Sequence, residues 1–342
     1  MSDMSSANSK KKASQKGFAL VVVIVVMLMV SFLASELIML VRTELKISYN
    51  IKARVSGHFL AEAGISLGLF RLLGQRPVDI PSIGLPEDWE DKFYEGYEYE
   101  VYIPDGKVTY YVTDESGKID LNKSSSELLR LFLEFHLGED QEEQINDILA
   151  SLLDWKDSDD LYRDIGGRGA ESETYGELDD PYIARNGAIQ DPSEFFLIHA
   201  TEPLFGKFSP DEVFTVHNSG RKINYNSLTP AMLEFLTAGN KESVEAYREA
   251  KREFSGKIPL PVMIEIMGEF QYEKLRPFLV QTASSKFYTI VGKGYLGVTQ
   301  EEDLVPSDHD QSKKKMPGTL TSMLIEKNGV RYSTRAWQEQ FI

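Results

Sequence analysis

The stretch KKKASQKGFALVVVIVVMLMV, residues 10–30, sets four lysines directly before a Gly-Phe step and an apolar run. From Phe18 to Val41 the run is interrupted only by two serines and Glu36. As a helix rising 1.5 Å per residue, it would reach roughly 36 Å, more than the ~30 Å hydrocarbon core of a bilayer. The sequence therefore predicts one membrane span, with the lysines keeping the N-terminus on the cytoplasmic side.

Two simpler interpretations of this stretch are a cleaved secretory signal and a plain signal anchor. A secretory signal needs small residues at its cleavage site, whereas the candidate site, Phe32-Leu33-Ala34, has a bulky phenylalanine there. Residues 43–73 lack proline and continue a helical apolar period, which a plain anchor does not need. We therefore expect one helix from Phe18 to about Leu73, whose outer part packs against other helices.

The rest of the chain indicates an α+β fold. Residues 97–103 and 107–113 alternate around Pro104-Asp105-Gly106, which predicts a hairpin, and Asn328-Gly329 predicts a second hairpin near the C-terminus. Between these regions lie roughly 170 residues with mostly helical patterning. The simplest architecture is an antiparallel sheet packed on the long N-terminal helix and interrupted by a large helical insertion.

The insertion contains an internal repeat. KIDLN at 118–122 and KINYN at 222–226 each lead into a helix with matching apolar positions. Leu129 and Phe132 in the first helix correspond to Leu233 and Leu236 in the second. Two small, related helical modules are predicted.

Composition argues against several classes of function. The 342 residues carry 37 Lys and Arg against 53 Asp and Glu, a net charge of −16, which disfavours nucleic-acid binding. Helix-hairpin-helix DNA-binding modules are the rival class, but the corresponding turns, near Gly138 and Gly239, each offer one glycine instead of a Gly-x-Gly hairpin. There is no cysteine, which excludes disulfides and thiol chemistry.

Other motifs give no catalytic constellation. The five histidines are scattered: His58, His136, His199, His217 and His309. The pattern Gly292-x-Gly294-x-x-Gly297 resembles a dinucleotide fingerprint but is followed by a polar, turn-rich segment that includes Lys313 to Lys315. We therefore expect a loop between strands at this pattern, and a protein that is not an enzyme.

An acidic segment, residues 154–180, holds ten carboxylates against three basic residues. Such a segment is either solvated or neutralised by a cation, and calcium takes six to eight hard oxygen ligands in flexible geometry. The spacing is not that of an EF-hand, so charge alone leaves both interpretations open.

The N-terminal part resembles a type IV prepilin, because a short basic leader ends in Gly17 before Phe18 and a long apolar helix. By that resemblance, prepilin peptidase cuts the Gly17-Phe18 bond, leaves the span in place, and Phe18 becomes the methylated amino terminus. Most pilins and pseudopilins carry a glutamate five residues after the cut, and here that position is Val22. In that family, the glutamate carboxylate neutralises the amino terminus of the neighbouring subunit during assembly. A subunit that enters first has no earlier subunit whose amino terminus it must neutralise, so Val22 favours an initiating or tip component.

The body resembles the minor pseudopilin K of the type II secretion system. The resemblance rests on DESGKIDLN, LLDWKDSDD, GAE, YIARNGAIQDPSEF and the late Trp337. It implies a pilin-like core interrupted by two SAM-like helical units. The implied divisions are a leader (1–17), a membrane helix (18–41), its periplasmic continuation (42–73), a first part of the sheet (96–115), two SAM-like units (116–218 and 219–284) and a final part of the sheet (285–342).

The same resemblance implies a calcium site in the acidic segment. Its expected ligands are Asp157, Asp159, Asp160 and Glu171, with Asp154 as a fifth candidate that can instead close the preceding helix.

The implied role is to initiate and cap the tip of the secretion pseudopilus. The partners would be other minor pseudopilins through the N-terminal helix, prepilin peptidase, and the secretin or exoprotein cargo, with no nucleic acid. The protein would cross the inner membrane once, with its C-terminal body in the periplasm. A minor pilin of a type IV pilus is the alternative within the same superfamily.

Overall fold

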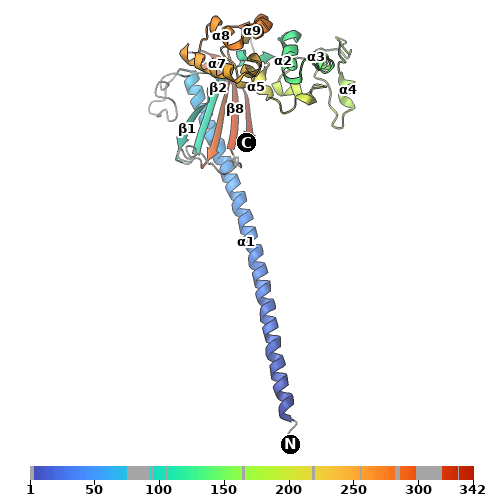
Figure 1. Ribbon diagram of the computed structural model, residues 1–342, viewed down its shortest axis with the longest axis vertical. Coiled ribbons are helices and arrows are strands. Elements are labelled where there is room, and N and C mark those ends of the chain that lie inside the picture. Colours follow the sequence, from blue (N-terminus) through green and yellow to red (C-terminus); the bar gives the residue numbers. More distant parts are fainter. Residues whose placement is uncertain are drawn as a thin grey trace. The chain divides into compact units, whose positions relative to one another are not determined.

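The computed structural model describes the backbone of residues 4–74, 93, 95–104, 106–163, 166–217, 220–254, 256–281, 286–297, 318–329 and 331–342, and side chains from residue 18 onward except that of residue 19. Two compact units make up the chain, Met1–Ser56 and Gly57–Ile342. Figure 1 shows the elements in sequence colours.

The first unit is helical from its first described residue. Helix α1 (Met4–Leu72) includes the predicted span and begins before Phe18, within the expected leader. Large apolar side chains from Phe18 to Tyr49 are exposed, including Val22. One helix in the described part of the chain is long and apolar enough to cross a membrane, and it is this one.

The second unit contains a five-stranded antiparallel sheet in the order β1-β2-β7-β8-β9. Its strands are β1 (Tyr99–Ile103), β2 (Gly106–Asp114), β7 (Phe287–Leu296), β8 (Gly318–Asn328) and β9 (Arg331–Phe341). Both predicted hairpins, β1-β2 and β8-β9, are present. The α+β prediction is therefore confirmed: residues 57–72 of α1 pack on this sheet, and the insertion leaves from β2 and returns at β7 (Figure 1).

Glycines bring α1 and β7 into backbone contact. A methyl group on Gly292 would lie 2.1 Å from the carbonyl oxygen of Ala61, and one on Gly294 would lie 2.2 Å from that of Gly57. On the helix side, a methyl group on Gly64 would lie 3.1 Å from the Cα of Gly292. We call these five residues the glycine contact; only residues without a β-carbon on β7 allow it.

The glycine contact corrects one prediction. Gly292 and Gly294 lie inside strand β7, so the interpretation of the Gly292-x-Gly294-x-x-Gly297 pattern as a loop was wrong for its first two glycines. Gly297 lies in the turn after the strand with a φ of 76°. The polar segment that follows, with Lys313 to Lys315, lies outside the described residues.

The insertion consists of short elements. They are η2 (Glu115–Gly117), β3 (Ile119–Asp120), α2 (Ser126–Leu137), α3 (Glu142–Lys156), α4 (Ser172–Gly176), η3 (Pro192–Leu197), η4 (Glu202–Leu204), α5 (Pro210–Val213), β4 (Phe214–Thr215), β5 (Ile223–Asn224), α6 (Pro230–Leu236), α7 (Lys241–Glu253), α8 (Leu260–Met267), α9 (Glu269–Leu275), η5 (Arg276–Phe278) and β6 (Leu279–Val280).

The predicted repeat has the same geometry twice. Strand β3, within KIDLN, pairs in parallel with β4, and β5, within KINYN, pairs in parallel with β6. The strand that begins each module therefore pairs with the strand that ends it. Asn122 exchanges two hydrogen bonds with the backbone of Ile189, and Asn226 accepts from the Ile258 N–H and donates to the Gln281 carbonyl. In both modules, an asparagine side chain thus fixes a distant loop.

The two modules share one hydrophobic core. Phe132 of α2 and Phe235 of α6 meet edge to face with ring centroids 5.3 Å apart, and both side chains belong to one buried cluster. A separate cluster that includes Ile65, Leu72, Val112 and Ile290 lies between α1 and the sheet. The modules therefore fold as one body, and the division at residue 218 remains a prediction.

Gly292→Ala should destabilise the full chain by about 1–3 kcal/mol, because the added methyl group meets backbone that cannot move aside cheaply. Chemical denaturation of the detergent-solubilised protein measures this difference. The matched control is Gly176→Ala, where the methyl group meets no described atom within 4 Å, and which should leave stability unchanged or slightly raised. Equal stability of Gly292→Ala and the wild type would refute the close helix–sheet contact.

Candidate functional site

The acidic segment lies between the end of α3 and the start of α4. Asp157 is the residue after the last turn of α3, and Glu171 is the residue before the first turn of α4. Asp157, Asp159 and Glu171 each offer a carboxylate oxygen, and these three atoms lie within 4.8 Å of one another. The structure thus brings together three of the five residues that the sequence analysis singled out as ligands.

Glu171 is the most unusual member of this group. Its side chain is 2% exposed, and neither carboxylate oxygen has a hydrogen-bond partner among the described residues. Burial, together with the negative charges of the neighbouring aspartates, raises the pKa of Glu171 to about 7. A buried carboxylate without donors costs several kcal/mol unless a cation or a proton compensates it.

Asp157 is only partly neutralised. Arg163 donates from its guanidinium to Asp157 Oδ2 at 2.7 Å, while Asp157 Oδ1 is buried and has no partner in the described part of the chain. The bound arginine fixes the side chain and leaves the second oxygen available to a cation. The sequence pattern gives no sign of this role of Arg163, because many arginines lie near acidic residues without orienting them.

Asp154 and Asp160 stand apart from the three-carboxylate group. Asp154 is fully buried within α3 and accepts hydrogen bonds from the Arg163 backbone N–H at 3.2 and 3.3 Å. Asp160 is exposed, and its Oδ1 accepts from the Asn186 side chain at 3.4 Å. Asp154 therefore ties down the loop that presents the ligands, and Asp160 links it to the segment after α4.

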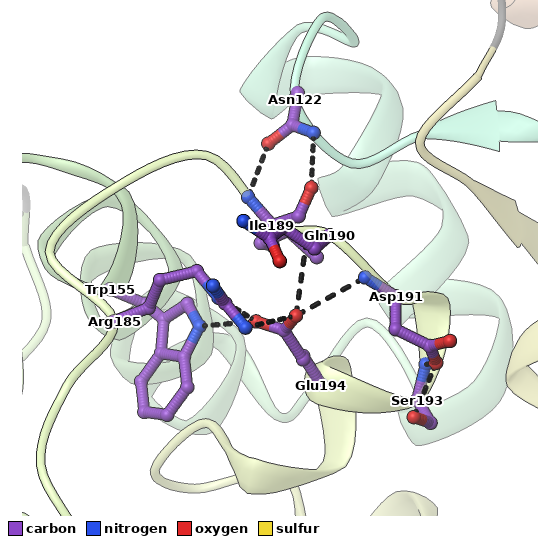
Figure 2. Close-up of polar contacts among 8 residues, drawn as sticks. All are labelled: Asn122, Trp155, Arg185, Ile189, Gln190, Asp191, Ser193 and Glu194. Carbon is purple, nitrogen blue, oxygen red and sulfur yellow. Dashed lines mark hydrogen bonds and ion pairs between the residues drawn. The ribbon is translucent and has the colours of Figure 1, made fainter.

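A rigid scaffold supports this loop. Trp155, the residue after Asp154, meets Tyr175 of α4 edge to face, and Tyr175 stacks on Tyr182. Figure 2 shows the next contacts. The guanidinium group of Arg185 donates two hydrogen bonds, one to each carboxylate oxygen of Glu194, and the indole N–H of Trp155 donates to the same carboxylate.

Glu194 also closes the turn that begins η3. It accepts the backbone N–H groups of Gln190 and Asp191, both at 3.1 Å, and Asp191 in turn accepts from Ser193 (Figure 2). Five donors thus converge on one buried carboxylate, in contrast to Glu171, which has none among the residues that the structure describes. The comparison indicates that Glu194 is structural and that Glu171 is suited to hold a cation.

The donor set fits calcium. Three carboxylates, one of them buried without donors, are hard anionic oxygens, and the flexible coordination of Ca²⁺ suits ligands drawn from a loop and a helix start. Within the described ranges, this is the one group of three acidic or histidine ligands close enough to hold a metal ion. His309 lies outside those ranges.

The expected processing residues lie in α1. Gly17 is part of the helix backbone, and Phe18 begins the exposed apolar stretch. The backbone geometry alone carries no sign of the expected cut, which remains a prediction.

The comparisons with known proteins agree with the sequence-based resemblance. Residues 114–210 match the family described as "Type II secretion system (T2SS), protein K". The fold resembles a chain of "The Crystal Structure of the GspK-GspI-GspJ complex from enterotoxigenic Escherichia coli Type 2 Secretion System", with 14% identity, a TM-score of 0.52, and coverage of 87% of this chain and 99% of that one. The comparison with curated proteins gave no match. The resemblance to a type II secretion minor pseudopilin K is thereby confirmed.

Calcium should stabilise the full chain, and the effect should depend on Glu171. At about 100 times the dissociation constant, bound metal contributes roughly 2.7 kcal/mol, or a rise in Tm of about 5 °C, measured by thermal unfolding with Ca²⁺ or with a chelator. Glu171→Gln should remove the calcium response and raise the Tm in chelator, because it replaces a buried charge with a neutral amide.

Glu177→Gln makes the same change at an exposed acidic residue and should keep the full response to calcium. A wild-type Tm that is the same in Ca²⁺ and in chelator would contradict the calcium site. So would a Glu171→Gln variant that responds like the wild type.

Proposed function

We propose that this protein initiates and caps the pseudopilus of a type II secretion system. The observation that carries the proposal is a single chain in which the end of an exposed apolar helix packs on a pilin-like sheet, and in which residues 114–210, the first part of the insertion, match protein K. The role is architectural: the helix anchors and assembles, and the insertion occupies the end of the fibre.

The first step is processing at the inner membrane. Prepilin peptidase removes residues 1–17 and Phe18 becomes the N-methylated amino terminus, while the apolar helix remains in the bilayer. The four lysines of the leader hold the N-terminus in the cytoplasm, so the body enters the periplasm.

Val22 supports an initiating position. A subunit within a fibre can use a carboxylate near its amino terminus to neutralise the terminus of its neighbour, because an unpaired buried charge is costly. Val22 is apolar and cannot do so. A first subunit has no earlier neighbour, and for it an apolar residue is the more stable choice in lipid.

The insertion supports a terminal position. It extends from the end of β2 at Asp114 to the start of β7 at Phe287, and most of the second unit belongs to it. A body of this size is too bulky to repeat along a narrow fibre of stacked helices. At the tip it is free to meet the secretin or the exoprotein cargo.

Other minor pseudopilins are the proposed partners. The similar solved chain comes from a complex of three such subunits. In this protein, the amphipathic outer part of α1 would pack against the helices of the neighbours. Calcium, held by Asp157, Asp159 and Glu171, would fix the acidic loop within the head.

The mature amino terminus provides the test of processing. In cells with prepilin peptidase, mass spectrometry of the purified protein should find a chain that begins with N-methylated Phe18, and in cells without the enzyme it should find a chain that begins at Met1. Gly17→Leu should block the cut, whereas Gln15→Leu, two residues away in the leader, should not. A chain that begins beyond Ala34 would contradict the proposal, because the helix would have been lost.

A further inference from the structure

The outermost strand of the sheet, β9, carries three exposed aromatic side chains. Tyr332 and Trp337 are 45% exposed, and Phe341 is 49% exposed. Large aromatic side chains are costly to leave in water, and three of them along one strand exceed what scattered surface residues require. We call these three residues the aromatic strip.

Strand register places the aromatic strip on the face of the sheet that α1 covers. Trp337 lies opposite Met323, which packs in the buried cluster between α1 and the sheet. Tyr332 lies opposite Lys327, whose ammonium group donates to the carbonyl oxygen of Leu72 in α1. Residues directly opposite in an antiparallel pair share a face, so the strip lies beside α1 and not on the side of the insertion.

The distance from β7, which α1 covers, to β9, which carries the strip, matches the usual distance between the axes of two packed helices. Through the glycine contact, residues 57–72 of α1 lie over β7. Strand β9 is the second strand from β7, because β8 lies between them. Two strand spacings amount to about 9.5 Å, and packed helices lie about 8–10 Å apart. A helix over β9 would therefore contact the strip and the flank of α1 at once.

The flank of α1 beside β9 adds negative charge next to an exposed aromatic ring. The ring of Phe59 is exposed and meets His58 edge to face. His58 lies 3.5 Å from a carboxylate oxygen of Glu62 and 3.3 Å from one of Glu339, which is on the same face of β9 as the strip. Two half-exposed carboxylates around one imidazole favour a partner that offers a cation here.

A helix explains these features better than an added strand does. A strand bound to the edge of β9 that has no strand partner among the described residues would use backbone hydrogen bonds and would leave the aromatic faces in water. The register shift between Leu324 and Ile325, opposite β9, also makes the edge irregular, and such irregularities oppose strand addition.

We propose that the aromatic strip and the flank of α1 form a docking groove for the N-terminal helix of another minor pseudopilin. That helix carries an apolar stripe and a lysine or arginine that faces Glu62 and Glu339. The inference rests on the proposed function and adds to it the surface by which the partner is held.

Site-specific photo-crosslinking tests the groove in cells that produce the complete secretion system. The full chain carries p-benzoylphenylalanine at position 337 or 341 and, as matched controls, at 338 or 340, which lie on the opposite face of the same strand. Crosslinks from 337 and 341 should map to the helix of another minor pseudopilin and exceed those from 338 and 340 by about tenfold, as expected for the centre of an interface.

Substitution gives an independent readout. Trp337→Ala should reduce co-purification of the partner by about tenfold or more, whereas Gln338→Ala should leave it unchanged. Melting temperatures of both variants should match the wild type, because both side chains are substantially exposed.

Crosslinks that map to a second copy of this chain, to a strand of the partner or equally to both faces of β9 would overturn the groove. So would normal co-purification of Trp337→Ala. If the wild-type chain co-purifies with another pseudopilin while positions 337 and 341 give no adduct, the groove alone is refuted. If the wild type co-purifies with none, the proposed function fails as well.

Discussion

The backbone contact between α1 and β7 is the constraint on which the pilin-like unit depends. Where Gly292 and Gly294 meet Gly57, Ala61 and Gly64, helix and strand approach more closely than side chains normally allow. This contact fixes residues 57–72 of α1 over β7, the middle strand of the five-stranded sheet. It also provides a rigid base from which the insertion departs at β2 and to which it returns at β7.

Local patterns were sufficient for much of this architecture. The apolar run from Phe18 and the helical period after it predicted α1, because a membrane span and an amphipathic stripe are both local signals. Alternation and Asn328-Gly329 predicted the hairpins. The paired motifs at 118–122 and 222–226 predicted two modules, and the structure shows why they repeat: each places an asparagine that binds a distant loop. Each of these signals lies within about ten residues of the feature it predicts.

Features that depend on distant residues leave no local pattern in the sequence. The pattern around Gly292 predicts a loop and not a strand, because the reason for a glycine there is Ala61, more than two hundred residues away. The acidic segment offered ten carboxylates, and composition could not show that Asp157, Asp159 and Glu171 converge while Asp154 is held by the backbone of Arg163. The burial of Glu171 without a hydrogen-bond donor in the described part of the chain likewise depends on the fold, and no local pattern predicts it. The resemblance to protein K predicted a calcium site in the acidic segment, and the structure distinguishes the buried Glu171 from the fully bonded Glu194 within the described residues.

These parts make physical sense together if the protein occupies one end of a fibre. An apolar helix that leaves the membrane needs other helices to cover it, a head too large to repeat needs a terminal place, and Val22 suits a subunit with no predecessor. Immunogold electron microscopy of sheared pseudopili, with antibody against the insertion, tests this central claim most directly. The account predicts label at one end of each fibre and nowhere along its length. Label distributed along the length of the fibre would contradict it. So would pseudopili that form in normal number in cells that lack this protein.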